Sequence, residues 1–202
     1  EMLAYRSGAR GVMVALPTMA TSNAMYARVR RWMSRLGQGG EFTTQLIHSQ
    51  SAMNDDHSAL KRTGMNVRTN ASSLCCEDSA SVVHAWMTGS RRAILSDFSV
   101  GTIDQVLYAG LNRKYTVLPH FGLAQKVLVI DEVHDHDVYM RQFLVKVLRW
   151  CGAYGIPVVA LSATLTPSVR AELHAAYSNT DVGSDYLLPA DTVAYPLITS
   201  SS

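Results

Sequence analysis

The chain has 202 residues, of which 48% are hydrophobic and 17% are charged, and its formal net charge is +2. This length and composition predict one globular domain with a full core, and the small net charge excludes nucleic-acid binding through an overall basic surface. No apolar run reaches the length of a membrane span, and the N-terminus lacks the parts of a signal peptide, so no membrane partner is expected. The cysteines, Cys75, Cys76 and Cys151, form no CxxC pair, which argues against a zinc site and favours a reducing cytoplasm.

Strand and helix patterns alternate from the N-terminus onward. Residues 1–7 are expected to end a helix, residues 11–16 to form a short buried strand, and a polar loop at 18–23 to open a helix of about four turns. Arg28, Arg31 and Arg35 share one face of that helix. A solvated flank is the simpler interpretation of this face, and a face toward DNA is the alternative.

The middle of the chain is less periodic. A second strand is expected at 43–47, an insertion or mobile loop at 50–78, and a helix at 79–87. Short strands at 93–95 and 98–100 then precede a helix that begins at Gly101 and Thr102, and residues 115–123 are expected to connect this helix to the next strand.

The second half contains the strongest strand pattern. Val127 to Ile130 form an uninterrupted aliphatic run, which is typical of a strand buried on both faces of a parallel sheet. A deeply packed helix at 138–150, a strand at 157–161 and a helix at about 166–177 follow, and Thr166 and Pro167 are suited to begin the last helix. This alternation predicts an α/β fold with a doubly wound, mostly parallel sheet.

Two adjacent acids, Asp131 and Glu132, follow the apolar run directly. In open α/β sheets ligands bind beyond the carboxyl ends of the strands, and adjacent acids there suit a bound cation. Nucleotide hydrolases use such a pair to hold Mg²⁺ and to orient the attacking water. The simpler interpretation of the pair alone is a strand that ends in solvated acids.

Further motifs favour the functional interpretation. DExH at Asp131–His134 and SAT at Ser162–Thr164 are separated by one helix-length segment, and they resemble motifs II and III of superfamily 2 helicases of the DEAH-like branch. The segments VGTIDQVL at 100–107, DVYM at 137–140 and ALPTMATSNAMYARV at 15–29 narrow the resemblance. Together they resemble the CRISPR-associated helicase-nuclease that the Cascade complex recruits in type I interference systems.

The resemblance implies a role for each matching residue. Asp131 and Glu132 match the Mg²⁺-binding and water-activating acids, and His134 matches the residue that couples the nucleotide site to the loop carrying Ser162 and Thr164. Contacts to the backbone of single-stranded DNA are implied for Pro17, Thr18, Thr21, Gly101, Thr102, Asp104 and Gln105. Ser162 and Thr164 as turn residues, and Asp104 and Gln105 as first-turn acceptors, are the structural alternatives.

The chain contains no GxxxxGK[ST] phosphate loop. Together with the resemblance, this predicts residues 1–202 as part of a first RecA-like lobe of the P-loop NTPase type, without its first strand and phosphate loop, with residues 179–202 leading toward a second lobe. The longer parent would use ATP and Mg²⁺ and carry a nuclease domain, whereas the isolated chain is expected to be inactive.

Two other functions remain open at this point. The chain could be a lobe that binds DNA or a partner without hydrolysis, or part of a DEAH-like RNA helicase, although VGTIDQ and DVYM argue against the latter. The run His134, Asp135, His136 and Asp137 also suggests a metal site, but consecutive side chains do not converge easily on one ion. Asp135 and His136 depart from the Ala and Tyr that the family usually has there.

Overall fold

The computed structural model describes residues 2–36, 42–48, 81–82, 92–111, 117–135 and 137–181. Its centre is a parallel sheet in the order β3-β2-β4-β1-β5-β6. The strands are β1 (Gly11–Leu16), β2 (Phe42–Ile47), β3 (Ser81–Val82), β4 (Phe98–Thr102), β5 (Lys126–Ile130) and β6 (Val158–Ala160). The α/β fold with a parallel sheet is therefore confirmed.

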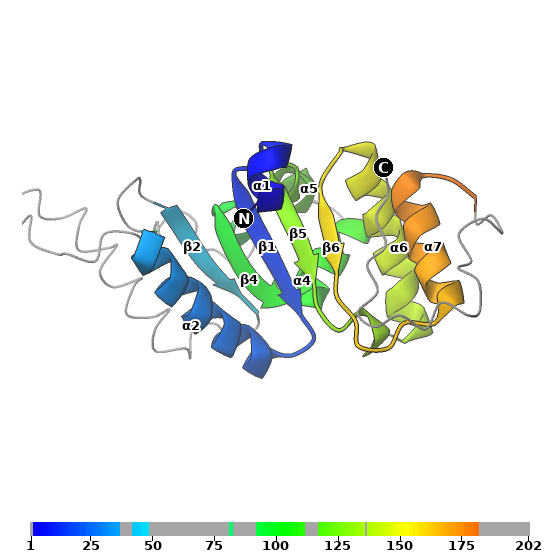
Figure 1. Cartoon of the computed structure of the whole chain (residues 1–202), viewed down its shortest axis with the longest axis horizontal. Coiled ribbons are helices and arrows are strands. Elements are labelled where there is room, and N and C mark those ends of the chain that lie inside the picture. Colours follow the sequence, from blue (N-terminus) through cyan, green and yellow to red (C-terminus); the bar gives the residue numbers. More distant parts are fainter. Residues whose placement is uncertain are drawn as a thin grey trace, which may run out of the picture.

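Helices cover both faces of the sheet (Figure 1). The longer ones are α2 (Met19–Leu36), α6 (Val138–Ala153) and α7 (Pro167–Ser178), and the shorter ones are α1 (Met2–Ser7), α4 (Ile103–Leu107) and α5 (Val117–Leu123). Short 3₁₀ turns lie at Ala93–Leu95, Tyr108–Gly110 and Val133–Asp135.

The core has two parts because successive strand residues point to opposite faces. On one face Leu16, Leu46 and Val100 pack against Tyr26 of α2. On the other face a larger cluster joins Met13, Ala15, Leu128 and Ile130 to residues of α4, α6 and α7. The central strands are thus buried from both sides, as the aliphatic run at 127–130 predicts.

The strand register brings the ends of four strands to one edge of the sheet. Leu16 of β1 pairs with Thr102 of β4, Ala15 pairs with Ile130 of β5, and Ile130 pairs with Ala160 of β6. The residues that follow these strands leave the sheet at its carboxyl edge, which is the lower edge in Figure 1. Gly101 allows β4 to approach β2 there, since a Cβ on it would lie 2.3 Å from the carbonyl oxygen of Ile47.

Several local predictions need correction. Residues 93–95 form a 3₁₀ turn and not a strand, because three apolar residues are too few to distinguish the two. Gly101 and Thr102 end β4, so the helix begins at Ile103. The expected connector at 115–123 contains α5, and Ser81–Val82 pair with β2 as a strand where a helix is expected. The expected insertion at 50–78 lies outside the described residues, as does the expected exit segment beyond residue 181.

Candidate nucleotide and nucleic-acid edge

The acid pair occupies the carboxyl edge at the end of β5. The backbone N–H of Asp131 donates to the carbonyl oxygen of Ala15 at 2.9 Å, so the first acid is held beside the end of β1. Glu132 follows with a φ of 53°, a left-handed conformation that is uncommon for a residue with a side chain. Its N–H donates to Oδ1 of Asp131 at 3.0 Å. Both side chains are partly exposed, so both can reach a ligand in solvent.

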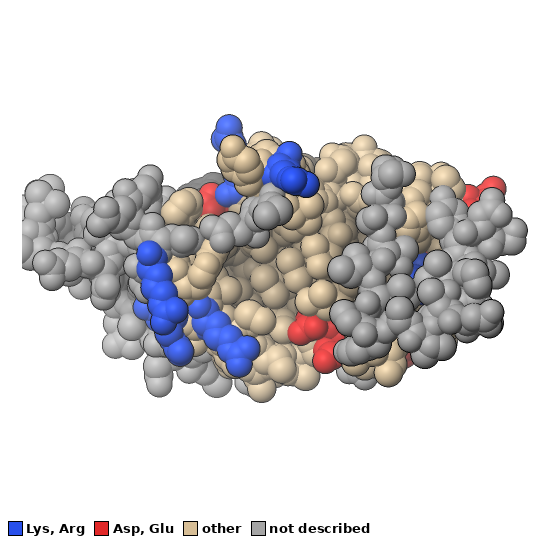
Figure 2. All heavy atoms as spheres, viewed as in Figure 1, with Lys and Arg blue, Asp and Glu red and all other residues tan. Residues whose placement is uncertain are grey.

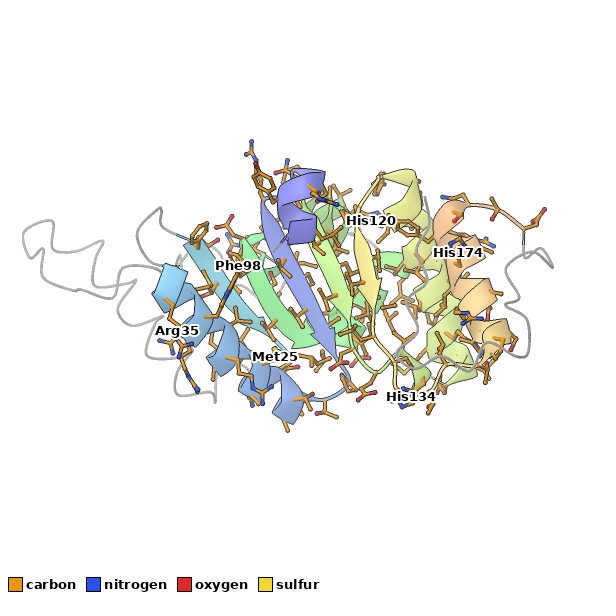
Figure 3. All side chains as sticks on the ribbon, in the orientation of Figure 1. Met25, Arg35, Phe98, His120, His134 and His174 are labelled. Atoms are coloured by element: carbon orange, nitrogen blue, oxygen red, sulfur yellow. The ribbon has the colours of Figure 1, made fainter. Side chains whose placement is uncertain are left out.

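His134 connects the acid pair to the loop after β6. Its Nδ1 lies 3.3 Å from Oε2 of Glu132 and 3.0 Å from Oγ of Ser162. The two backbones are also joined, because Val133 N–H donates to the carbonyl oxygen of Leu161 at 3.0 Å. One imidazole nitrogen therefore faces both a carboxylate and a hydroxyl group. Figure 3 shows His134 at the lower edge, below the ends of β5 and β6.

Thr164 lies on the same loop as Ser162 and is exposed. The loop leads to Thr166, whose hydroxyl accepts a hydrogen bond from the N–H of Val169 and so caps α7, as the Thr-Pro pair predicts. Asp137 caps α6 in the same way, through the N–H of Met140 at 2.7 Å. Asp137 thus has a structural role at the start of α6.

Thr18 and Thr21 form a reciprocal cap at the start of α2. The hydroxyl of Thr18 accepts from the N–H of Thr21 at 3.2 Å, and the hydroxyl of Thr21 accepts from the N–H of Thr18 at 3.3 Å. Both side chains are exposed, and Pro17 before them is partly exposed. The cap stabilises the loop after β1, and β1 itself pairs with β5, the strand that leads to the acid pair.

The predicted contact residues after β4 differ in their exposure. Gly101 and Thr102 are buried, with Thr102 only 7% exposed, whereas Asp104 is exposed and Gln105 is partly exposed. Thr102 occupies the cap position of α4 without a side-chain cap hydrogen bond. The strand register places this segment beside the loop of Thr18 at the same edge.

A further pair at this edge lies outside the predicted site. His48 follows β2, and its Nε2–H donates to Oδ1 of Asn23 in α2 at 2.9 Å. Burial lowers the pKa of His48, which favours the neutral ring. The pair joins the end of β2 to the second turn of α2. A histidine directly after a buried strand is the only signal in the sequence that points to it.

The residues present fit one part of a Mg²⁺-nucleotide site. Carboxylate oxygens are the ligands that Mg²⁺ prefers, and one or two carboxylates with phosphate oxygens and water complete its shell. Asp131 and Glu132 can supply these carboxylates, but the chain carries no phosphate-loop sequence to hold a triphosphate. Among the described residues no three His, Cys, Asp or Glu side chains gather into a metal site, and no helix there is long and apolar enough to cross a membrane.

Comparison with known proteins identifies relatives along nearly the whole chain. No protein-family model matches it. The chain is 38% identical over 207 residues to the CRISPR-associated nuclease/helicase Cas3 of Streptococcus thermophilus, which covers 98% of the chain and 22% of the relative. It is 37% identical to the CRISPR-associated endonuclease/helicase Cas3 of Thermus thermophilus, over 90% of the chain and 19% of that relative.

Solved structures agree with these sequences. The crystal structure of T. fusca Cas3-ADP has a TM-score of 0.72 at 35% identity and covers 87% of this chain and 18% of that one. The structure of T. fusca Cas3-AMPPNP has a TM-score of 0.69 at 36% identity and covers 84% of this chain and 17% of that one. The chain thus spans about a fifth of the length of the relatives that it matches. Over the segment that it shares with them, the chain belongs to the family of the CRISPR-associated Cas3 proteins.

Proposed function

We propose that residues 1–202 are part of the first RecA-like lobe of an ATP-dependent translocase that moves along single-stranded DNA in CRISPR interference. The observation that carries this proposal is the carboxyl edge, where Asp131, Glu132, His134 and Ser162 meet. The names of the relatives, nuclease/helicase and endonuclease/helicase, support the activity of the whole protein, and the titles with ADP and AMPPNP support a nucleotide ligand.

Each residue at the edge has a proposed task. Asp131 binds Mg²⁺ through water, and Glu132 orients and deprotonates the water that attacks the γ-phosphate. When bound, Mg²⁺ neutralises charge on the phosphate oxygens. His134 holds Glu132 and Ser162 together, so a change at the nucleotide shifts the loop of Ser162 and Thr164.

The proposed DNA contacts lie beside these residues, on the loops after β1 and β4. Pro17, Thr18 and Thr21 present an exposed helix start, and backbone N–H groups at such a start attract phosphate. Gly101, Thr102, Asp104 and Gln105 form the neighbouring segment. Contacts to the sugar-phosphate backbone do not depend on the base sequence of the DNA, and the affinity that they provide falls as the salt concentration rises.

The remaining parts of the proposal concern the longer protein. It would work in the cytoplasm with the Cascade complex, use ATP and Mg²⁺, and carry a nuclease domain, while residues 179–202 lead toward its second lobe and 50–78 form an insertion. The chain alone would not hydrolyse ATP, because its sequence contains no phosphate loop to hold the triphosphate against Asp131 and Glu132.

Substitution of the exposed cap tests the DNA contacts. Thr18→Ala removes one hydroxyl from the loop after β1, and Thr166→Ala removes the matching cap from α7, so each costs about 1 kcal/mol of helix capping. Binding of a labelled single-stranded DNA, followed by fluorescence anisotropy, should weaken for Thr18→Ala and stay unchanged for Thr166→Ala. Equal affinities for the two variants would contradict the proposed contact.

The same anisotropy assay distinguishes the proposed translocase lobe from an RNA helicase lobe and from a scaffolding lobe. The proposed translocase lobe binds single-stranded DNA more tightly than RNA of the same sequence, whereas a DEAH-like RNA helicase lobe shows the opposite order. Binding to Cascade subunits without any binding to DNA would favour a scaffolding lobe.

A further inference from the structure

An arginine-rich face of α2 lies outside the residues proposed above. The helix Met19–Leu36 contains four arginines and no acidic residue. Arg28, Arg31 and Arg35 are exposed and follow one another at intervals of three and four residues, so they share one face of the helix. We call these three residues the α2 arginine face. Figure 2 shows blue side chains along α2, to the left of the red group at the lower edge of the sheet.

The chain's small net charge hides this concentration of charge. Residues 1–50 contain six arginines and two glutamates, a net charge of +4, whereas residues 51–202 contain 12 basic and 14 acidic residues, a net charge of −2. The N-terminal quarter is therefore locally basic, and α2 carries most of its arginines. A local groove or face can bind a polyanion even where the whole chain is nearly neutral.

The α2 arginine face continues from the proposed DNA-binding edge. α2 begins directly after Thr18, and its start lies at the carboxyl edge of the sheet. From there the helix runs outward to Arg35, which Figure 3 labels at the side of the molecule away from His134. At 1.5 Å per residue, Arg28 and Arg35 are separated by about 10 Å along the axis, which allows neighbouring guanidinium groups to contact successive phosphates.

An aromatic ring lies among these arginines. Trp32 is 37% exposed and packs its ring edge-on against Phe98 of β4 at 5.9 Å. It stands four residues after Arg28 and three before Arg35, so it borders the same face. Aromatic rings beside arginines are typical of surfaces that bind single strands, because bases stack on the ring while phosphates pair with the cations.

We propose that the α2 arginine face, Arg28, Arg31 and Arg35 with Trp32 beside them, is a second phosphate-contacting surface that extends the path of a single-stranded nucleic acid from the carboxyl edge along α2. This inference rests on the proposed function, since it lengthens the same path. It replaces the simpler interpretation of these arginines as a solvated flank. An acidic protein surface is the alternative partner for these arginines, and competition with polyglutamate distinguishes it from a nucleic acid.

The test compares two double variants. One removes two arginines from α2, and the other removes Arg6 of α1 and Arg10, which directly precedes β1. Arg28→Ala/Arg35→Ala is compared with Arg6→Ala/Arg10→Ala, because Arg6 and Arg10 are also exposed and the loss of charge is equal. Binding of a labelled 20-nucleotide oligothymidylate is measured by anisotropy from 50 to 300 mM salt. The α2 variant should bind more weakly, and its slope of log affinity against log salt should be less steep by about 1.4, at about 0.7 per phosphate contact. The Arg6→Ala/Arg10→Ala variant should keep the slope of the unsubstituted chain.

Three results would overturn the inference. One is an unchanged salt slope for Arg28→Ala/Arg35→Ala, and another is an equal loss of slope in both double variants, which would indicate general charge attraction. The third is competition by polyglutamate as strong, per charge, as competition by unlabelled oligothymidylate, which would favour an acidic protein.

If Thr18→Ala weakens binding while the α2 variant does not, the inference fails and the proposed function stands. Arg28→Lys/Arg35→Lys, which keeps the charge, should restore most of the affinity, and thermal unfolding shows that each variant folds.

Discussion

At the scale of single residues, Glu132 is the least predictable part of the site. Its φ of 53° turns the chain directly after β5, so its carboxylate lies against His134 while Asp131 stays beside β1. Such a conformation costs about 1 kcal/mol for a residue with a Cβ and persists where surrounding contacts enforce it. The DExH sequence predicts which residues act together. It contains no signal for the left-handed turn, because Gly or Asn would normally mark one.

Lys126 is a second residue whose environment is hidden in the sequence. It begins β5 at the edge opposite the acid pair and is 4% exposed, and its Nζ donates to the carbonyl oxygen of Ile94 and to Oγ of Ser99. Burial lowers its pKa to about 7, against the opposing influence of Asp97. The carboxylate of Asp97 itself accepts from the N–H and hydroxyl of Thr43 at 2.8 and 2.7 Å.

This lowered pKa predicts a pH-dependent stability. Between pH 7 and about 10.4, the usual lysine pKa, unfolding takes up a proton at Lys126, so the free energy of unfolding rises with pH by about 1.4 kcal/mol per unit. Below pH 7 both states are protonated and the contribution of Lys126 is constant. Urea unfolding at pH 6.5 to 9.5 should therefore show a rise for the unsubstituted chain that Lys126→Met lacks. Parallel pH profiles for the two proteins would refute this account of Lys126.

At the scale of elements, most segments with a clear apolar pattern were predictable. β1, β2, β5, α6 and α7 lie close to their expected positions, because apolar residues mark each of them. α2 begins earlier than expected, at Met19, because Thr18 and Thr21 cap the helix where a polar loop at 18–23 was expected. α5 contains Pro119, which hides the helical pattern although proline is tolerated in a first turn, where its missing N–H has no partner to lose. The turn at Ala93–Leu95 is closed by the next residue, Ser96, whose hydroxyl donates to the carbonyl oxygen of Ala93 at 2.9 Å.

The helix α6 was expected to be deeply packed, and this holds for one side only. Leu144, Val147, Leu148 and Cys151 are buried, whereas Tyr139 and Trp150 are 67% and 48% exposed. Burial raises the pKa of the Cys151 thiol to about 12, so this cysteine is held as an unreactive thiol in the folded chain. Hydrophobicity alone did not distinguish the two sides, because the exposed side also carries large aromatic residues.

Close packing of α6 against α7 depends on Gly152. A Cβ on this residue would lie 1.7 Å from the carbonyl oxygen of Tyr177, so Gly152→Ala must push the two helices apart. We expect a loss of about 3 kcal/mol in the free energy of unfolding. Gly8→Ala is the control, since Gly8 has a φ of 68° and open space around its Cβ position, and it should lose only about 1 kcal/mol. Equal losses in urea unfolding would show that the helices tolerate the added methyl group.

At the scale of the whole molecule, the parallel register brings four separate motifs to one edge of the sheet. Pro17 and Thr18, Gly101 and Thr102, Asp131 and Glu132, and Ser162 are far apart in sequence, yet each follows or ends a strand of the same sheet. The alternation of strands and helices was sufficient to predict this convergence. Which side chains touch was not predictable, because the contacts of His134 with Glu132 and Ser162 depend on the path of two loops.

The central claim is that Asp131 and Glu132 act on a Mg²⁺-bound triphosphate that the 202-residue chain cannot hold alone. The most direct measurement is the rate of ATP hydrolysis, with Mg²⁺ and single-stranded DNA, by this chain and by the longer protein that we propose contains it. We expect no turnover by the chain. For the longer protein we expect turnover that Glu132→Gln reduces by at least about 100-fold, as loss of a general base does, and that Glu172→Gln on α7 leaves unchanged. Turnover by the isolated chain that is lost on Glu132→Gln, or full activity of the longer Glu132→Gln protein, would contradict the claim.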